Sequence, residues 1–91
     1  PPSLFFYRDT NGNEVDVVIR SGRKLVPIEI KSAGTFTEEF LKGISRFRET
    51  VGGRATGGHV LYNGKEKFDF KGVGVSNPFV HNILATAASP A

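Results

Sequence analysis

The sequence predicts an α/β or α+β domain with a mixed sheet and the element order β-β-β-α-β-β. Three short apolar runs separated by turn residues occupy the first third of the chain, which is typical of strands joined by hairpins. One amphipathic stretch with helical periodicity follows, and further apolar runs return after it. Strands on both sides of one helix favour a sheet with that helix packed on it. The 91 residues suit a single domain, which we place at residues 1–84.

The first three predicted strands cover residues 4–8, 15–20 and 25–31. The first connection contains Asn11-Gly12, a strong signal for a tight hairpin. The second connection is a short polar turn that includes a glycine. These signals predict two consecutive antiparallel hairpins.

Residues 35–51 predict an amphipathic helix. Thr35 and Glu38 have the spacing of a capping box, and Gly52-Gly53 can supply the left-handed residue that ends a helix. The stripe predicted to face the core consists of Phe36, Phe40, Leu41, Ile44, Phe47 and Val51.

The remaining elements are shorter. Residues 58–63 predict a fourth strand, and residues 65–75 predict a weaker strand or two. Pro78 can open a short helix that runs to Leu84, and residues 85–91 are expected to form a frayed tail. Because the chain begins without Met and contains none, we expect it to be a fragment or C-terminal domain of a longer protein.

The composition excludes several classes of function. Without Cys, the chain forms no disulfide, thiolate zinc site or cysteine nucleophile, and it lacks the Walker A lysine motif for ATP. His59 and His81 have no partner at metal-ligand spacing. No apolar run is long enough to span a membrane. The absence of Cys leads us to expect a cytoplasmic protein. The net charge of +3 mildly favours anionic partners.

Acidic residues on the second and third strands are expected to face each other. The four-residue turn sets a register in which Asp16 lies directly opposite Glu29, and Glu14 lies opposite Lys31. Because side chains alternate along a strand, these four charged side chains share one face. The other face, which we predict to be buried, then carries Val15, Val17, Ile19, Val26, Ile28 and Ile30.

Two carboxylates in this arrangement need a positive partner. Directly opposed residues have Cβ atoms about 4.5–5.5 Å apart, so Asp16 and Glu29 repel each other unless a cation lies between them. Mg²⁺ takes one or two carboxylates, and Lys31 on the same face could orient a water or stabilise phosphate charge. The alternative is a solvated face with a Glu14–Lys31 salt bridge. This alternative is weakened because the same face also carries Val18, Leu25 and Pro27.

Two groups of basic residues are candidate phosphate contacts. One lies at the tip of the second hairpin and the other on the polar side of the helix. Such contacts would be strongly salt-dependent. Ordinary solubilising charge is the alternative explanation. The residues are Arg20, Arg23 and Lys24 in the hairpin, and Lys42 and Arg46 in the helix.

Asp16 followed by Glu29-Ile30-Lys31 on the next strand resembles the PD-(D/E)XK, or restriction-endonuclease-like, superfamily. The wider pattern, with residues 6–8, 13–19 and 27–32, is similar to the C-terminal domain of unknown function of bacterial and archaeal AAA-type P-loop ATPases. The resemblance covers roughly residues 4–84. It implies a restriction-endonuclease-like mixed sheet with a flanking helix.

The resemblance also implies a site and a function. Asp16, Glu29 and the backbone carbonyl of Ile30 would bind Mg²⁺ or Mn²⁺, with Glu14 as a possible further ligand, and Lys31 would be the catalytic lysine. The expected substrate is DNA, and ATP would bind only to an upstream ATPase module. A catalytically inactive interaction module of that ATPase is the alternative, as is a structural fragment with an incidental acidic pair. Members normally begin with a helix before the first strand, and here that helix is either missing or lies upstream of residue 1. A truncated first helix could leave an apolar edge and permit a homodimer.

Overall fold

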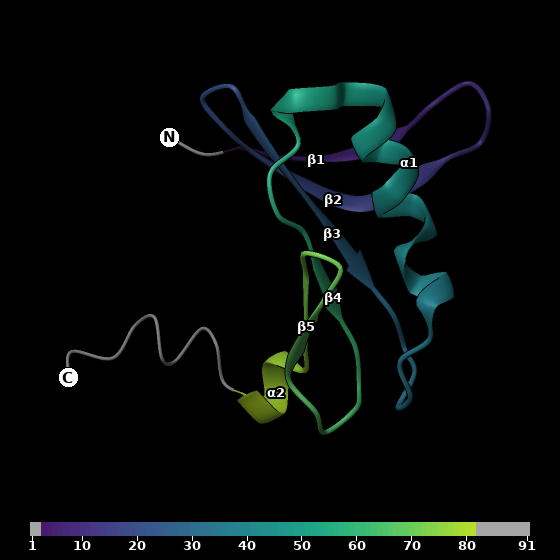
Figure 1. The fold of residues 1–91 in the computed structure, drawn as a ribbon, viewed down its shortest axis with the longest axis vertical. Helices are drawn as coiled ribbons and strands as arrows, with labels where there is room; N and C mark the ends of the chain where they lie inside the picture. Colours follow the sequence, from purple (N-terminus) through teal and green to yellow (C-terminus); the bar gives the residue numbers. More distant parts are fainter. Residues whose placement is uncertain (1–2, 82–91) are drawn as a thin grey trace, which may run out of the picture.

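The computed structural model describes residues 3–81 and shows a mixed α+β fold (Figure 1). The expected class and the order β-β-β-α are confirmed, but three strands rather than two follow the helix. The region 65–75, where one or two strands were expected, contributes two of them. The expected tail, and the helical residues expected after His81, lie outside the described residues. The strands are β1 (Ser3–Arg8), β2 (Glu14–Ser21), β3 (Lys24–Ile30), β4 (His59–Leu61), β5 (Phe68–Phe70) and β6 (Val73–Ser76). The helices are α1 (Lys42–Val51) and α2 (Pro78–His81), with 3₁₀ turns η1 (Glu38–Leu41) and η2 (Gly52–Arg54) on either side of α1.

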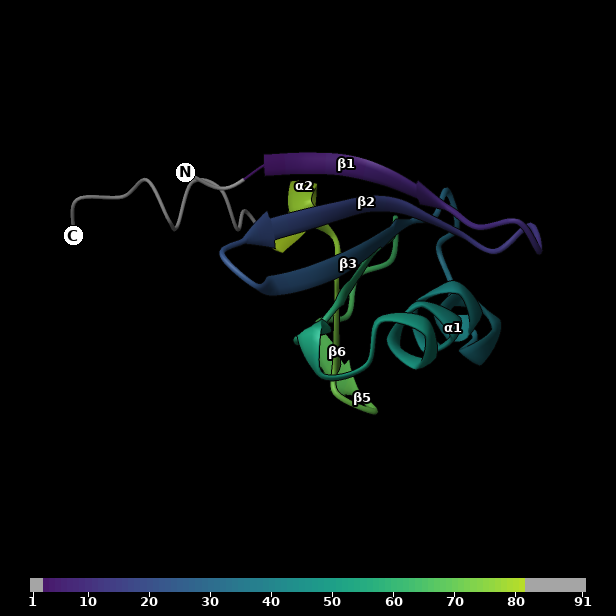
Figure 2. The same ribbon diagram turned by 90° about the horizontal axis from the view of Figure 1, so that it is seen from above.

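All six strands form one sheet in the order β1-β2-β3-β4-β6-β5. The first three strands are antiparallel hairpin partners, whereas β4 runs parallel to both β3 and β6. A parallel neighbour requires a crossover connection, and α1 provides it between β3 and β4. Figure 2 shows that α1 packs on one face of β1, β2 and β3.

A β-bulge in β2 shifts its register against β1. The pairs Phe5–Val18 and Tyr7–Val15 enclose one residue on β1 but two on β2. The extra residue brings Val15 and Val18 to the same face, where they are 2% and 0% exposed. The alternation of side chains between the two faces, which a regular strand follows, is therefore broken at Asp16 and Val17.

The expected register between β2 and β3 is confirmed from Ser21–Lys24 to Val17–Ile28, but the expected buried face is wrong. Helix α1 covers the opposite face, which carries Val18, Leu25 and Pro27. Because side chains alternate along a strand, the sequence divides them between two faces, but it does not determine which face the crossover helix covers. Of the six residues expected to be buried only Val15 is, because of the bulge; Val17, Ile19, Val26 and Ile28 are half-buried, and Ile30 is 55% exposed.

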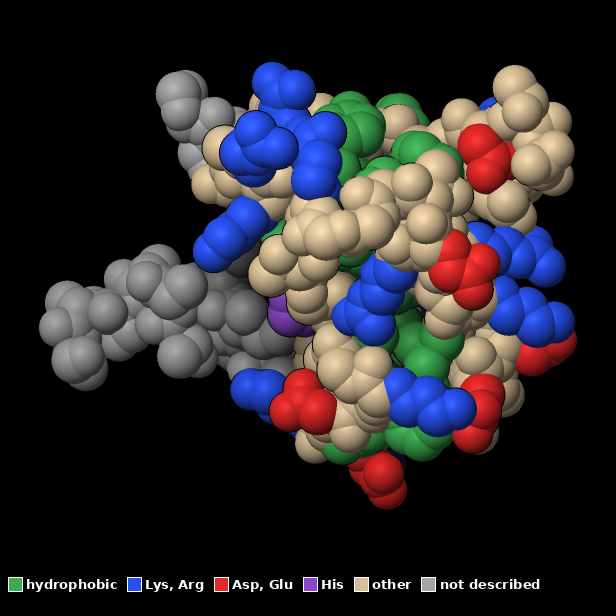
Figure 3. Space-filling view, turned by 45° about the horizontal axis from the view of Figure 1, so that its top comes forward, with side chains coloured by type: hydrophobic (Ala, Val, Ile, Leu, Met, Phe, Trp, Pro, Cys, Tyr) green, Lys and Arg blue, Asp and Glu red, His purple; other side chains and the backbone are tan. Residues whose placement is uncertain are grey.

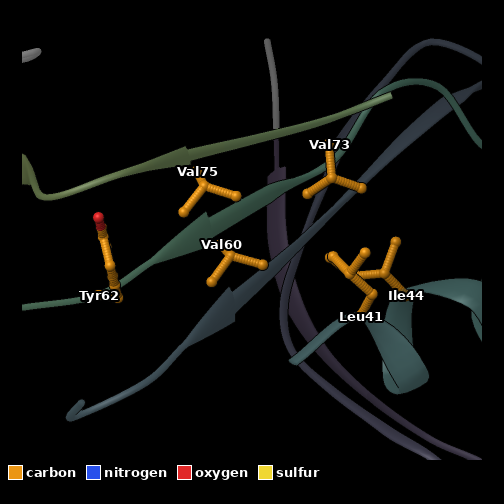
Figure 4. Packing of buried hydrophobic residues seen from close by; sticks show 6 residues of the cluster. All are labelled: Leu41, Ile44, Val60, Tyr62, Val73 and Val75. Carbon is orange, nitrogen blue, oxygen red and sulfur yellow. The ribbon is translucent and has the colours of Figure 1, made fainter. Parts of the chain in front are cut away.

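Helix α1 contributes to two core clusters, with Ile44 buried in the first and Phe47 buried in the second. Figure 4 shows the first cluster, in which Val73 and Val60 lie near Leu41 and Ile44, while Val75 lies further along its strand toward Tyr62. The apolar stripe of the helix is confirmed as core, with Phe36 and Phe40 half-buried against this cluster. The second cluster consists of Val15, Val18, Leu25 and Phe47, with Tyr7, Val51 and Ala55 packed against it.

The helical segment begins later than expected. Thr37, not Thr35, is the N-cap residue of η1, and no side chain caps the backbone there. The expected capping box of Thr35 and Glu38 is therefore wrong, because Glu38 is already the first residue of the 3₁₀ turn. The expected C-terminus is confirmed: Gly52 has a φ of +63°, which favours glycine.

Arg48 fastens α1 to the loops around β4 and β6. Its guanidinium donates hydrogen bonds to the carbonyls of Gly57, Lys71 and Gly72. Guanidinium has five donors and no acceptor, so one side chain can satisfy several carbonyls. Gly57 precedes β4, and Lys71 and Gly72 precede β6, so these bonds join the helix to the end of the sheet where the two parallel strands begin.

We predict that Arg48→Ala destabilises the fold by about 2–3 kcal/mol, because hydrogen bonds from a charged group contribute roughly this much and the carbonyls lose their donor. Urea denaturation measures the change. The control is Arg20→Ala at an exposed position of β2, expected to change stability by less than about 0.5 kcal/mol. Equal stabilities of the two variants would contradict a clamping role for Arg48.

Candidate functional site

A pocket of about 250 Å³ lies where β2, the end of β3 and the start of α1 meet. Because β2 and β3 are paired and α1 covers them, residues far apart in sequence converge here. The pocket is lined by the three residues of the expected catalytic set and by three further candidates. These are Asp16, Glu29 and Lys31, with Glu14, Lys42 and Arg46.

The bulge determines how Asp16 enters this pocket. Instead of joining the backbone ladder opposite Glu29, Asp16 lies beyond its last pair, Val17–Ile28. The Oδ2 atom of Asp16 accepts a hydrogen bond of 2.8 Å from the backbone N–H of Ile30. The Asp16 carboxylate is thus fixed against β3 by one oxygen.

Glu29 is the buried acid of the site, with 5% of its surface exposed. Burial, and then the negative charge of Asp16, raise the pKa of Glu29 from 4.5 to about 7, while Lys31 opposes this shift. Asp16 and Glu29 therefore act on each other electrostatically, as the sequence predicted, although they do not form a backbone pair. Near neutral pH the Glu29 carboxyl group is therefore partly protonated, and a bound cation would displace that proton.

Lys31 lies beside Glu29, with its Nζ atom 3.6 Å from Glu29 Oε2 and 5.7 Å from the centre of the Phe40 ring. The alternative interpretation, a solvated face with a Glu14–Lys31 salt bridge, required a pair that the structure does not contain among its described residues. Glu14 instead pairs with Arg8 of β1, at 2.7 Å, because these two residues are direct partners across the β1–β2 ladder.

Gly43 was missed in the sequence and is central to the packing of this site. A Cβ atom at Gly43 would lie 2.6 Å from the backbone oxygen of Glu14 and 2.8 Å from Oε1 of Glu29. Only the absence of a side chain allows the first turn of α1 to approach the buried carboxylate this closely. An isolated glycine inside an otherwise helical pattern was the available signal.

The two candidate basic groups lie in different places. Lys42 and Arg46 line the pocket, where Lys42 Nζ is 2.8 Å from Glu39 and Arg46 donates a 2.8 Å hydrogen bond to Asn13. The hydrogen bond from Lys42, and then its charge, hold the pKa of Glu39 below its usual value. The other group, Arg20, Arg23 and Lys24, lies at the opposite end of the hairpin.

The charge distribution follows this division. Figure 3 shows Lys and Arg side chains gathered at the upper left, over the β2–β3 hairpin, while acidic and basic side chains are mixed on the right. The basic hairpin tip is therefore outside the acidic pocket. The structure brings Lys42 and Arg46, but not the hairpin group, next to the carboxylates.

The donor set fits a hard divalent cation. Asp16 and Glu29 offer carboxylate oxygens, and Mg²⁺ usually takes one or two carboxylates with waters completing its shell. Within residues 3–81, no group of three or more His, Cys, Asp or Glu could hold a metal ion together. Further ligands would therefore be water or backbone carbonyls. The role expected for the carbonyl of Ile30 stays a prediction.

Fold and site define a mixed α+β domain with a half-enclosed acidic pocket and an adjacent lysine. The chain belongs to the family described as domain of unknown function DUF4143, which matches residues 1–80. A comparison with curated proteins found no match. In the described part of the chain, no helix is both long and apolar enough to cross a membrane.

We predict that stability falls with rising pH because of Glu29. Between its unfolded value of 4.5 and its folded value of about 7, the folded chain binds more protons than the unfolded chain. The free energy of unfolding should therefore decrease over this interval, by about 3 kcal/mol at most. Denaturation of the wild type and Glu29→Gln at pH 5 and pH 8 measures this. The same pH dependence in both proteins would rule out Glu29 as its source.

We predict that Gly43→Ala destabilises the fold by about 1–3 kcal/mol, because overpacking outweighs the roughly 1 kcal/mol gain in helix propensity. Gly53→Ala is the matched control, since a Cβ atom there meets nothing within 4 Å. Thermal unfolding compares the two. A stabilised Gly43→Ala protein would mean that the first turn of α1 can move away from Glu29 without cost.

Proposed function

We propose that this domain is a PD-(D/E)XK-type nuclease that hydrolyses DNA phosphodiester bonds with Mg²⁺ or Mn²⁺. The observation that supports this most directly is the convergence of Asp16, Glu29 and Lys31 in one pocket. A carboxyl group whose pKa is shifted by burial and by a like charge is typical of functional sites.

In this proposal Asp16 and Glu29 hold the metal, with the carbonyl of Ile30 as a further candidate ligand. Glu14, the other ligand expected from the sequence, is paired with Arg8 instead. When bound, the metal supplies positive charge to the phosphate and makes a bound water more acidic. Glu29 must lose its proton for this, and its pKa of about 7 places that loss near neutral pH. Asp16 is already oriented by its hydrogen bond to Ile30.

Lys31 has a position suited to the reacting phosphate. Its ammonium group lies at the pocket between Glu29 and the ring of Phe40, so it is held at one side of the acidic pair. From there it can orient the attacking water or stabilise the charge that develops on the phosphate oxygens.

Lys42 and Arg46 would attract the DNA backbone to the rim of this pocket. Both are bound to polar partners in the free protein, so they would exchange Glu39 and Asn13 for phosphate oxygens. Arg20, Arg23 and Lys24 would contact the backbone further along the strand. Such contacts weaken steeply with salt.

The second candidate is a catalytically inactive interaction or regulatory module attached to a P-loop ATPase. The exposed apolar side chains of Leu4, Phe6 and Ile30, which are 69%, 85% and 55% exposed, favour a protein partner, either that ATPase or a second copy of the chain. ATP would then bind only to the attached module.

We predict that the wild type cleaves supercoiled or branched DNA in Mn²⁺, and that Lys31→Ala reduces the rate about 100-fold or more while Mn²⁺ binding persists, because Lys31 acts on charge in the transition state. Isothermal titration should show that Asp16→Asn weakens Mn²⁺ binding at least about tenfold, because it removes a ligand charge.

Lys67→Ala is the control for loss of a positive charge away from the pocket and should retain both properties. Mn²⁺ binding by the wild type without any DNA cleavage would favour the inactive module. Equal Mn²⁺ binding by the wild type and Asp16→Asn would remove Asp16 from the metal site.

A further inference from the structure

A second and larger cavity lies at the carboxyl ends of two parallel strands. Strands β3 and β4 run in the same direction, so the loops that follow them meet at one edge of the sheet. Backbone hydrogen bonds from Lys31 to Leu61 and from Asn63 to Ala33, each 2.8 Å, hold these loops together. The cavity between them has a volume of about 640 Å³, within the range of ligand sites.

Aromatic rings form much of the wall of this cavity, which we call the aromatic pocket. Phe36, Tyr62 and Phe68 line it, together with the polar residues Asn63 and Lys65. The rings of Phe36 and Phe68 meet edge to face, with centroids 5.3 Å apart. A flat, apolar ligand that also carries polar edges suits such a lining.

Tyr62 is held rigidly in this wall. Its hydroxyl donates a 2.7 Å hydrogen bond to the carbonyl of Glu66 and accepts a 3.0 Å bond from the Glu66 N–H. Gly64 lies directly against the ring, since a Cβ atom there would fall 2.2 Å from it. The aromatic pocket is therefore formed before any ligand enters it.

The aromatic pocket adjoins the acidic pocket through two rings. Phe36 of the aromatic pocket lies 5.8 Å, centroid to centroid, from Phe40, which lines the acidic pocket and lies 5.7 Å from Lys31 Nζ. Stacked DNA advances about 3.4 Å per nucleotide along one strand. A strand with a phosphate at Lys31 would thus bring a base to the aromatic pocket within about three to four nucleotides.

We propose that the aromatic pocket binds an unpaired nucleobase of the DNA strand whose phosphate lies at the acidic pocket. This inference rests on the proposed nuclease function and specifies its substrate. A base in an intact duplex is stacked and paired and cannot enter a cavity, whereas an unpaired base can stack on aromatic side chains. The preferred substrate is then DNA with single-stranded nucleotides beside the cleavage position.

The test measures, by fluorescence anisotropy, the binding of a fluorescein-labelled 12-nucleotide oligothymidylate to the 91-residue chain. EDTA is present so that no cleavage occurs. We expect Phe68→Leu to weaken this binding about 5- to 100-fold, because stacking on one aromatic residue accounts for roughly that factor. Phe70→Leu is the matched control, because Phe70 belongs to the same strand and also contacts Phe36 but does not line the pocket. It should bind within about twofold of the wild type.

A second arm leaves the protein unchanged. A 12-nucleotide strand of abasic sites carries the same phosphates without bases, and it should bind the wild type as weakly as oligothymidylate binds Phe68→Leu. A 12-base-pair duplex should also bind more weakly than the single strand at equal salt. Equal binding of the abasic and thymidine strands, or unchanged binding of oligothymidylate by Phe68→Leu, would overturn the proposal that the aromatic pocket binds a base.

The two proposals can fail separately. Base-dependent binding without any metal-dependent cleavage would leave the aromatic pocket standing and remove the nuclease. Cleavage that depends on Lys31, with binding that ignores bases, would do the reverse.

Discussion

The buried carboxylate of Glu29, held under the first turn of α1, is the constraint on which the site depends. Gly43 lets the helix approach until its backbone lies against Glu29 and the carbonyl of Glu14. This approach closes one side of the pocket and removes water from the acid. The same contact that packs the helix on the sheet therefore sets the electrostatics of the site.

The electrostatic consequence is a site that favours either a proton or a cation. Burial and the charge of Asp16 raise the pKa of Glu29, and the single neighbouring ammonium of Lys31 only partly offsets them. A hydrogen bond from the backbone of β3 holds the Asp16 carboxylate beside Glu29. A divalent cation would neutralise both acids at once, which is the physical basis for the metal-dependent function proposed above.

The sheet is covered unequally. Helix α1 packs on the face that carries Leu25, Pro27 and Glu29, and the opposite face of the hairpins keeps half-buried and exposed apolar side chains such as Ile30. Strands β3, β4 and β6 run parallel, an arrangement usually covered on both faces. Among residues 3–81, this second face keeps exposed apolar side chains, which gives physical support to the interaction module as the second candidate.

Much of this protein was determined by the sequence itself. Turn residues and apolar periodicity were sufficient for the hairpins, their register from Val17 to Lys24 and the apolar stripe of α1, because these depend on neighbours close in sequence. The choice of Asp16, Glu29 and Lys31 as a common site also followed from that register. Tertiary structure decided which face α1 covers, since alternation divides a strand into two faces without ranking them. It also decided the bulge at Asp16, the burial of Glu29 against Gly43 and the pairing of Glu14 with Arg8, because each depends on segments brought together only when the chain crosses from β3 to β4.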